Sequence, residues 1–382
     1  MKTLTVSLGN YSYPIHLQEN LLDRAGELCK TVGIGSRVAV ITDSTVKELY
    51  LNRVHDSLTS QGFEVHPIEI TPGEQSKSLQ VVEKIYDTLI EQRFERSSGI
   101  IALGGGVVGD LAGFVAASLL RGINYVQIPT TLIAQTDSSI GGKVGVNHKL
   151  GKNLIGAFYQ PKLVIIDPLV LHTLPRREWI AGMGEVIKYG VIRDAGFFVM
   201  LEKNIDEILK LENMSRIEDM ILRCCEIKAD VVSEDEKEQN VRRILNFGHT
   251  IGHVFESATG YERFLHGEAV FLGMIAAGWL SRKYEQFPEE EFHRLESLVR
   301  KMGLNPDLTD ISDEMFLEHI SRDKKVKQGK VHFVLVRRLG ETIIRSDIKQ
   351  EDVISAFHYV QQTFKKHYNH KEHEETTKDT KK

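Results

Sequence analysis

The stretch SGIIALGGGVVGDLAGFVAASLL, residues 98–120, decides the fold. Its first part, Ser98–Leu103, is a short apolar run that predicts a buried β-strand. The glycine-rich turn Gly104–Asp110 follows at once and satisfies the pattern G-x-G-x-x-G, and Asp110–Leu120 predicts a helix. Glycines let a backbone approach a ligand closely, and the N-terminus of a helix favours a pyrophosphate. The stretch therefore predicts a dinucleotide- or phosphate-binding turn in an α/β fold.

This turn departs from the usual dinucleotide fingerprint in its position. The fingerprint normally follows the first strand and has an acidic residue about 20 residues further on. Here the turn follows roughly the third predicted strand, and the segment Asn124–Thr131 holds no carboxylate. Asp43, at the end of the earlier apolar run Arg37–Thr42, is a better candidate for binding ribose hydroxyls. A tight packing turn between a strand and a helix is the alternative explanation of the glycines.

Strand and helix patterns alternate around the turn. The segments Phe63–Ile70 and Leu163–Ile166 predict further strands, and Leu79–Gln92 carries its apolar residues on one face of a predicted helix. Alternation of this kind is typical of a mostly parallel sheet whose two faces are covered by helices.

The second half of the chain changes character near Pro175. Helical periodicity dominates after this residue, although Val331–Leu335 and Glu341–Ile344 predict a small late β element. The last residues are nearly all charged or polar and predict a disordered tail. The expected divisions are an α/β nucleotide-binding domain at residues 1–175, a mainly helical domain at 176–364 and a polar tail at 365–382.

Composition limits the kind of protein. A chain of 382 residues with 41% hydrophobic residues is long for a single core, so two domains are expected. The net charge of -5 argues against binding to nucleic acid or to an anionic membrane. Cys224 and Cys225 are adjacent and Cys29 is distant, which favours a reduced, cytoplasmic protein. The apolar runs are too short to span a bilayer, and we expect no signal peptide.

The segment PTTLIAQTDSSIGGKVGVNHKLGKN, Pro129–Asn153, is unusually polar for the middle of a chain. It contains Lys143 and Lys152, and the pair Gly141-Gly142 would let the backbone approach a ligand. Long segments without regular structure are uncommon and are usually functional. We therefore interpret it as a wall of an anion-binding site, with an ordinary surface loop as the alternative.

A pair of histidines indicates a metal site. In NFGHTIGH, residues 246–253, His249 and His253 are four residues apart, so they share a face of a helix. The residue after the first histidine is Thr250 and not the glutamate of zinc peptidases, so this is not a peptidase motif.

Two further segments extend the candidate ligand set. His266 follows in LHGEAV, and GMGEVIKYG places Glu185 and Lys188 three residues apart on one helical face. A glutamate with two or three histidines is a suitable ligand set for zinc, and catalytic zinc usually has three protein ligands. The alternative for each histidine alone is a hydrogen-bonded residue of the core or of a helix end.

Taken together, these segments resemble the 3-dehydroquinate synthase family. They run in the family's order and cover nearly the whole chain except the tail. The motifs are PGEQSK (72–77), GGGVVGDLAGF (104–114), PTTLIAQTDSSIGGKVGVNH (129–148), GKNLIGAFYQP (151–161), GMGEVIKYG (182–190), NFGHTIGH (246–253), HGEAV (266–270) and DKK (323–325).

The resemblance implies an N-terminal α/β NAD-binding domain and a mainly helical metal-binding domain, with the active site in the cleft between them. It also implies bound NAD, one zinc or cobalt ion and a homodimer. Glu185, His249 and His266 would ligate the metal, and His253 would act beside it. The implied enzyme is an NAD- and metal-dependent phosphate lyase of the shikimate pathway, which leads to the aromatic amino acids.

The implied reaction converts 3-deoxy-D-arabino-heptulosonate 7-phosphate to 3-dehydroquinate and phosphate. It proceeds by transient oxidation with NAD, β-elimination of phosphate, re-reduction, ring opening and aldol closure. The substrate carries a carboxylate and a phosphate and therefore requires fixed cations. The expected catalytic and substrate-binding residues are Lys143, Lys152, Asn153, Lys188, Arg242, Asn246, His253, Arg121 and one or both of Lys324 and Lys325.

The same resemblance implies contacts to the cofactor. Asp137 would orient the nicotinamide half of NAD. The other expected contacts are Asp43, Glu74, Lys77, Gly105, Gly106, Val107, Asp110, Thr130, Thr131, Ser138, Lys143, Lys152 and Thr173.

Three other functions compete with this one. A metal-dependent alcohol or glycerol dehydrogenase would share the glycine turn and a histidine-bearing helical domain, but it would not need so many cations. A related sugar phosphate cyclase would differ in its product, and by resemblance Asn153, His253 and a lysine of DKK favour the synthase. A non-catalytic NAD-binding regulator would not need complete sets of metal ligands and cations.

Overall fold

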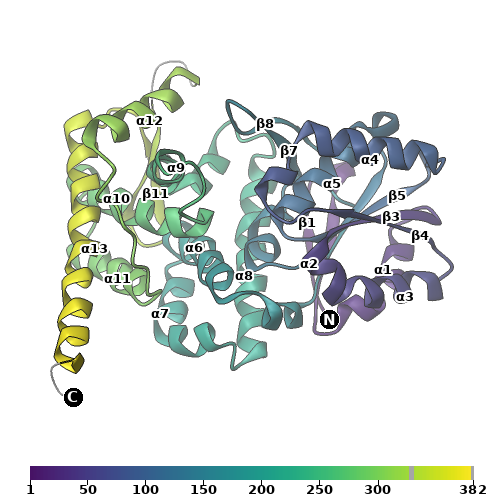
Figure 1. The fold of residues 1–382 in the computed structure, drawn as a ribbon, viewed down its shortest axis with the longest axis horizontal. Coiled ribbons are helices and arrows are strands. Elements are labelled where there is room, and N and C mark those ends of the chain that lie inside the picture. Colours follow the sequence, from purple (N-terminus) through teal and green to yellow (C-terminus); the bar gives the residue numbers. More distant parts are fainter. Residues whose placement is uncertain (327–330, 380–382) are drawn as a thin grey trace. The chain divides into compact units, whose positions relative to one another are not determined.

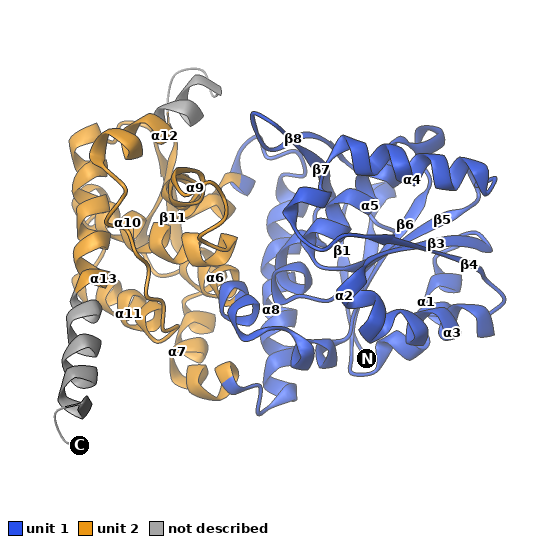
Figure 2. Cartoon of the chain, viewed as in Figure 1, with its two compact units in different colours: residues 1–182, 210–242 blue, residues 183–209, 243–382 orange. Residues whose placement is uncertain are grey.

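The computed structural model describes residues 1–326 and 331–379, and within them the side chains of residues 1–320 and 331–365. Lys324, Lys325 and nearly all of the expected tail therefore lie outside the described side chains. The chain forms two compact units (Figure 2). Unit 1 comprises Met1–Gly182 and Lys210–Arg242, and unit 2 comprises Met183–Leu209 and Arg243–Lys382.

Unit 1 is built on a seven-stranded sheet with the order β1-β2-β9-β6-β5-β3-β4. The pair β1–β2 is antiparallel and the other pairs are parallel, as the alternating pattern predicts. The strands are β1 (Lys2–Val6), β2 (Tyr13–Leu17), β3 (Arg37–Asp43), β4 (Glu64–Ile70), β5 (Gly99–Gly104), β6 (Asn124–Pro129) and β9 (Leu163–Ile166).

Helices cover both faces of this sheet (Figure 1). Val38 and Val40 of β3 lie in the core under α1 and α3, and Ala39 and Ile41 lie in the core under α4 and α5. Successive residues of a strand point to opposite faces, so the continuous apolar run of β3 is buried on both sides. The helical elements are η1 (Gly9–Tyr11), η2 (Leu21–Arg24), α1 (Ala25–Thr31), α2 (Ser44–Val46), η3 (Lys47–Leu51), α3 (Asn52–Ser60), η4 (Glu74–Ser76), α4 (Leu79–Glu91), α5 (Gly106–Ser118), η5 (Leu119–Arg121), η6 (Ala134–Ser138), η7 (Pro168–Thr173) and α8 (Met214–Glu234).

The order of the strands creates a switch point between β3 and β5. The chain runs from β3 to β4 on one side, and β5 then pairs with the opposite side of β3. Crevices at the carboxyl ends of strands that flank such a point are the usual ligand sites of open α/β sheets. The glycine turn follows β5 and therefore lies at this point.

The segment Pro129–Asn153 is more ordered than a long loop. After η6 it forms the antiparallel hairpin of β7 (Lys143–His148) and β8 (Gly151–Phe158). Val144 and Val146 are buried in the core under α5. The sequence interpretation found no apolar period in this segment and missed the hairpin, because Gly145 separates two valines among polar residues.

Unit 2 is mainly helical and carries the predicted late β element, β10 (Phe333–Arg338) paired with β11 (Glu341–Arg345). Its helix α10 is buried along almost its whole length and packs against α9, α11, α13 and β10. The elements of this half of the chain are α6 (Arg176–Arg193), α7 (Ala195–Lys210), η8 (Val241–Asn246), α9 (His249–Ala258), α10 (His266–Glu285), α11 (Glu289–Arg300), α12 (Asp313–Val326) and α13 (Gln350–Asp379).

The compact units differ from the divisions expected at 1–175 and 176–364, because the first boundary falls after Gly182 and residues 210–242 join the first unit. Residues 210–242, which include α8, group with the N-terminal residues because α8 packs against β1 and η6. The chain thus leaves unit 1 and returns to it, which local periodicity does not reveal. Among the described residues, no helix combines the length and apolar character that a bilayer crossing requires.

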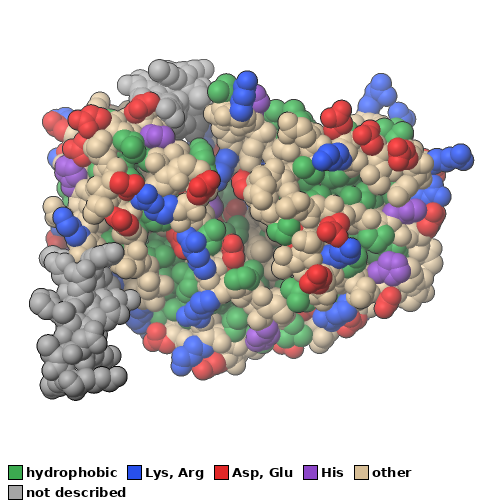
Figure 3. Space-filling view, viewed as in Figure 1, with side chains coloured by type: hydrophobic (Ala, Val, Ile, Leu, Met, Phe, Trp, Pro, Cys, Tyr) green, Lys and Arg blue, Asp and Glu red, His purple; other side chains and the backbone are tan. Residues whose placement is uncertain are grey.

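The visible face carries lysines and arginines interspersed with acidic side chains (Figure 3). This mixture agrees with the small negative net charge of the sequence.

Candidate active site

The carboxyl edge of the sheet in unit 1 gathers most of the expected NAD contacts. Asp43 ends β3, the glycine turn follows β5, and Thr130 and Thr131 follow β6. Helix α5 begins at Gly106, four residues earlier than predicted, and no side chain caps its N-terminus. Its first backbone N–H groups are therefore available to an anionic ligand. Val107 lies in this first turn, and Thr173 ends η7, which follows β9.

Close packing shapes the glycine turn. A Cβ atom at Gly105 would lie 3.0 Å from Cγ2 of Thr131, and one at Gly106 would lie 3.1 Å from the hydroxyl of Ser138. The structure therefore brings Gly105, Gly106, Thr131 and Ser138 together. The glycines permit this close packing, and they would also permit close approach of a ligand. The packing turn and the phosphate-binding turn are therefore compatible explanations.

Asp43 has a local structural role. Its carboxylate accepts hydrogen bonds of 3.0 Å from the backbone N–H groups of Thr45 and Val46 and so caps α2. Both bonds end on Oδ1.

A buried lysine links the PGEQSK motif to the hairpin. Lys77 donates hydrogen bonds of 2.5 Å to Oδ2 of Asp110 and to Oδ1 of Asn153. Glu74 accepts a bond of 2.7 Å from the side chain of Asn147. Burial raises the pKa of Asp110, and the Lys77 ammonium opposes this rise. The ammonium favours the ionised carboxylate and fixes η4, α5 and β8 together.

Asp137 pairs with a residue that the sequence interpretation missed. Lys228 of α8 donates to Oδ1 of Asp137 at 2.8 Å and to its carbonyl oxygen at 2.6 Å. The side chain of Lys228 is 7% exposed, so its charge requires a partner. Lys228 lies 91 residues from Asp137 in sequence and looks like one more residue of an amphipathic helix, so no local signal identified it.

Arg242 is almost fully buried at 1% exposure. Its guanidinium donates to the carbonyl oxygen of Gly141 at 3.0 Å and to that of Glu236. A Cβ atom at Gly141, where φ is +93°, would lie 2.5 Å from this guanidinium. Gly141 therefore makes room for Arg242, whereas the sequence interpretation attributed its freedom to a ligand.

The other expected cations of unit 1 lie in different surroundings. Lys143 is exposed and pairs with Glu238, and Lys152 is half-buried on β8. Arg121 is exposed and precedes β6, so it lies at the amino edge of the sheet, opposite the glycine turn. The structure does not bring Arg121 to the nucleotide edge of its own sheet.

In unit 2 the expected metal ligands converge. Nε2 of His249 lies 3.4 Å from Oε1 of Glu185, and Nε2 of His266 lies 3.5 Å from the same oxygen. One ligand atom from each of the three residues lies within 4.8 Å of the others. Two atoms bonded to a tetrahedral zinc at about 2.0–2.1 Å are about 3.3–3.4 Å apart, so these separations fit one zinc ion.

Glycines allow the three ligand-bearing helices to meet. A Cβ atom at Gly184 would lie 2.7 Å from the carbonyl oxygen of Gly267, next to Glu185 on α6 and His266 on α10. A Cβ atom at Gly273 would lie 1.9 Å from the carbonyl oxygen of Gly248, so α9 and α10 are also in close contact. Each ligand therefore has a glycine contact beside it.

The outer ring nitrogens of the two histidine ligands are engaged. Nδ1 of His249 lies 3.2 Å from the carbonyl oxygen of Phe247, and Nδ1 of His266 lies 3.4 Å from Oε2 of Glu256. Acceptors at Nδ1 favour the tautomer whose Nε2 lone pair is available to a metal. Glu256 is 2% exposed and was not recognised in the sequence.

The electrostatics of the cluster suit a metal ligand set. Burial, assisted by Lys188, lowers the pKa of His249 to about 3, so this ring is neutral at pH 7. Burial lowers the pKa of His266, but hydrogen bonds to Glu185 and Glu256 outweigh it and raise the value to about 10. In the metal-free protein His266 therefore holds a proton between two carboxylates, and a metal would displace it.

Lys188 forms a buried ion pair with Oε2 of Glu185, as their spacing on α6 suggested. This pair leaves Oε1 of Glu185 directed to the histidines.

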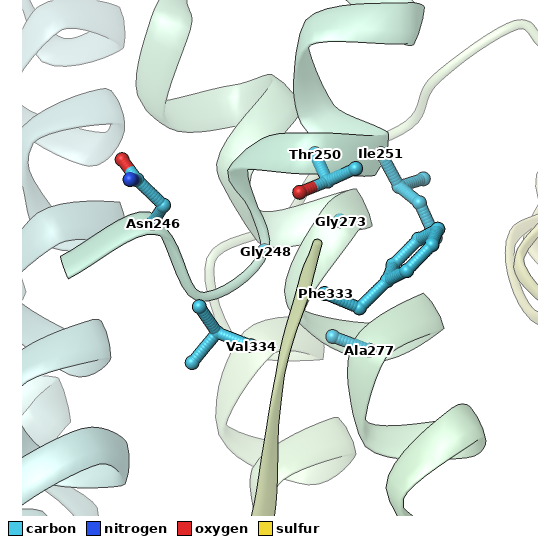
Figure 4. A pocket seen from close by; sticks show the side chains of 8 residues that line it. All are labelled: Asn246, Gly248, Thr250, Ile251, Gly273, Ala277, Phe333 and Val334. Atoms are coloured by element: carbon cyan, nitrogen blue, oxygen red, sulfur yellow. The ribbon is translucent and has the colours of Figure 1, made fainter. Parts of the chain in front are cut away.

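His253 lies beside the cluster. Its ring centroid is 5.5 Å from that of His249 and 6.1 Å from that of His266, and its side chain is 60% exposed. It is therefore near the ligands and accessible. Asn246 precedes α9 and lines a small hollow of unit 2 (Figure 4), together with Gly248, Thr250, Ile251, Gly273, Ala277, Phe333 and Val334. In that view its amide is directed away from the other labelled side chains.

An α/β unit with an open helix N-terminus at its switch point, and a helical unit with a Glu–His–His cluster, define the class of nucleotide- and metal-dependent enzymes. The family model for the N-terminal part of 3-dehydroquinate synthase matches residues 67–181, and that for the C-terminal part matches residues 182–326. The chain belongs to the 3-dehydroquinate synthase family.

Individual relatives agree with this assignment. A 3-dehydroquinate synthase of Desulforamulus reducens is 48% identical over 361 residues, covering 93% of this chain and 99% of the relative. A solved 2-epi-5-epi-valiolone synthase of Streptomyces hygroscopicus subsp. jinggangensis 5008, with NAD+ and Zn2+ bound, has a TM-score of 0.85, 27% identity and coverage of 93% and 98%. A 2-deoxy-scyllo-inosose synthase complexed with carbaglucose-6-phosphate, NAD+ and Co2+ has a TM-score of 0.82, 25% identity and coverage of 93% and 99%.

These comparisons confirm the family and fold class predicted from the sequence. The roles of individual residues, the location of the active site in a cleft, and the homodimer stay predictions.

Proposed function

We propose that this chain is a 3-dehydroquinate synthase that converts 3-deoxy-D-arabino-heptulosonate 7-phosphate to 3-dehydroquinate and phosphate. Family membership over 93% of the chain supports this activity. The observation that carries it is the convergence of Glu185, His249 and His266 with separations suited to one divalent ion. NAD would be the second cofactor, with zinc or cobalt as the metal.

When bound, NAD supplies a reversible hydride acceptor and the metal supplies a Lewis acid for a substrate hydroxyl. Glu185, His249 and His266 would hold the metal, and Lys188 pairs with the glutamate. The backbone N–H groups at the start of α5 bind phosphate groups of the cofactor, and Asp43 binds a ribose hydroxyl. Asp137, held by Lys228, orients the nicotinamide half.

The substrate's two anionic groups would be bound by fixed cations and amides. In unit 1 these are Lys143, Lys152, Asn153 and Arg242, and in unit 2 they are Lys188, Asn246 and His253. Arg242 and Lys188 are buried, where an electrostatic interaction is stronger than in water. Lys325 belongs to the same proposal by its place in the DKK motif.

A homodimer in the cytoplasm completes the proposal. The described structure joins none of the chain's three cysteines in a disulfide, and all three are buried, which supports a reducing compartment. Dimerisation rests on the family resemblance.

The test is a phosphate-release assay with the purified protein, NAD, zinc and the heptulosonate phosphate. We expect phosphate and 3-dehydroquinate in equal amounts and no accumulation of NADH, because the hydride is returned in each turnover. Steady formation of NADH from a simple alcohol would instead identify a dehydrogenase. Release of phosphate with a different carbocyclic product would identify a related sugar phosphate cyclase.

A further inference from the structure

Glu256 is a buried carboxylate that has no catalytic or cofactor-binding role in the proposed function. It lies near the end of α9, seven residues after His249 and three after His253, so all three residues share one face of the helix. A carboxylate with 2% exposure is costly unless it is paired. The described structure pairs it with His266 at 3.4 Å and places His253 at 4.0 Å.

The imidazole of His266 lies between two carboxylates. Glu185 faces Nε2 at 3.5 Å, and Glu256 faces Nδ1 at 3.4 Å. The ring can bind a metal through Nε2 only when its remaining proton is on Nδ1. The other tautomer would donate its proton to Glu185 and close the metal site.

Lys188 lies on the Glu185 side of the ring. Its buried ion pair with Glu185 offsets the charge of that carboxylate and weakens its attraction for the proton of His266. On the other side of the ring, Oε2 of Glu256 lies 3.4 Å from Nδ1 of His266, within hydrogen-bonding distance. When Nδ1 donates its proton to Glu256, the lone pair of Nε2 is available to a metal.

The two histidine ligands differ in this respect. Nδ1 of His249 lies beside the backbone carbonyl of Phe247, which no side-chain change removes. His266 depends on a side chain, so its orientation can be altered by a single substitution.

We propose that Glu256 is a positioning residue of the metal centre, which fixes the tautomer and the orientation of His266 without ligating the metal itself. The proposal rests on the assignment of Glu185, His249 and His266 as ligands. Carboxylates behind ligating histidines typically change metal affinity by about 10- to 100-fold when they are removed.

The test compares the metal-free full-length protein with the variants Glu256→Gln and Glu256→Met. Zinc affinity is measured by competition with a chromogenic chelator, and the cobalt-bound form is examined by its visible absorption spectrum. We expect Glu256→Met to weaken zinc binding by about 10- to 100-fold and to change the cobalt spectrum. Glu256→Gln, which keeps the shape and an acceptor oxygen, should have a smaller effect and should keep the experiment decisive if the methionine variant does not fold.

The matched control is Glu296→Gln, a substitution of another buried glutamate of unit 2, which pairs with Arg300 and Tyr359. It should leave zinc affinity and the cobalt spectrum unchanged. Affinities of the Glu256 variants within twofold of the unmodified protein would overturn the proposal. A drop from two bound metal ions to one would also overturn it, because Glu256 would then be a ligand of a second ion with His253 and His266.

The variant His249→Ala separates this proposal from the one on which it rests. If His249→Ala binds zinc normally, the ligand assignment is wrong. If His249→Ala loses zinc while Glu256→Met binds it normally, only the positioning role of Glu256 is wrong.

Discussion

The metal cluster of unit 2 and the segment Pro129–Asn153 of unit 1 were both identified from polar motifs, but they are built in different ways. The cluster uses three helices whose glycine contacts bring Glu185, His249 and His266 together before any metal binds. In the segment, Lys143 is an exposed residue of a hairpin and pairs with Glu238. A set of ligands held by helix packing is preorganised, whereas an exposed cation must be ordered by its ligand.

Residues of the two regions should therefore differ in how well they tolerate substitution. Substitution of a ligand residue of the cluster should strongly reduce metal binding and activity. Substitution of the glycines beside the ligands should also lower stability. Exposed residues of the segment should affect substrate kinetics with little effect on stability.

The largest effect is expected for His266→Ala, which removes a ligand from the preorganised cluster. Bound metal should be lost, and activity should fall on the order of 1,000-fold, since Lewis-acid stabilisation contributes several kcal/mol. Metal content by elemental analysis and phosphate release measure the two effects. His293→Ala, at an exposed histidine of α11 in the same unit, is the control and should change neither. A normal metal content in His266→Ala would contradict the ligand assignment.

The next effect tests whether helix contact preorganises the cluster. Gly184→Ala would place a Cβ atom 2.7 Å from the carbonyl oxygen of Gly267 and force α6 and α10 apart. We expect a loss of about 1–3 kcal/mol in the free energy of unfolding, measured with denaturant, and weaker zinc binding. In Gly196→Ala the new atom would lie 3.3 Å from a side-chain oxygen of Asp194 and would meet no backbone atom outside its own helix within 4 Å, so that control should change stability by less than about 0.5 kcal/mol. Equal stability of the two variants would contradict the role of Gly184.

The sequence predicted the parts of the fold and site that local periodicity determines. The buried run of β3, the apolar face of α4 and the Glu185–Lys188 spacing all follow from the period of a strand or helix. The family resemblance then supplied the NAD and metal requirement, and the metal ligands that the structure brings together.

Three features depended on long-range packing and were missed. The return of residues 210–242 to unit 1 follows from the contact of α8 with β1. Lys228 pairs with Asp137 and Glu256 pairs with His266, and in both pairs the partner lies on another element. A buried charge on an amphipathic helix looks like a surface residue until its partner is known.

A third prediction concerns the buried pair of Lys228 and Asp137 in unit 1. Like the metal ligands of unit 2, these charged side chains are held in place by the fold. The variants Lys228→Met and Asp137→Asn and their combination form a double-mutant cycle. Because the side chains are 7% and 25% exposed, we expect a coupling of about 1–3 kcal/mol in the free energy of unfolding. Activity should fall in each single variant. Additivity within about 0.3–0.5 kcal/mol would show that Asp137 is held by other contacts.

The smallest effect on stability is expected at Lys143, an exposed residue of the hairpin. Lys143→Met should change the free energy of unfolding by less than about 0.5 kcal/mol, because the Lys143 side chain is 47% exposed in its pair with Glu238. If Lys143 binds a substrate anion, kcat/KM should fall about 10- to 100-fold, as for the loss of a hydrogen bond to a charged group. Lys149→Met, at another exposed lysine of the same hairpin, should leave kcat/KM unchanged. Equal kinetics in the two variants would make Lys143 a surface charge, and the segment would then contribute to the site through its backbone and buried residues alone.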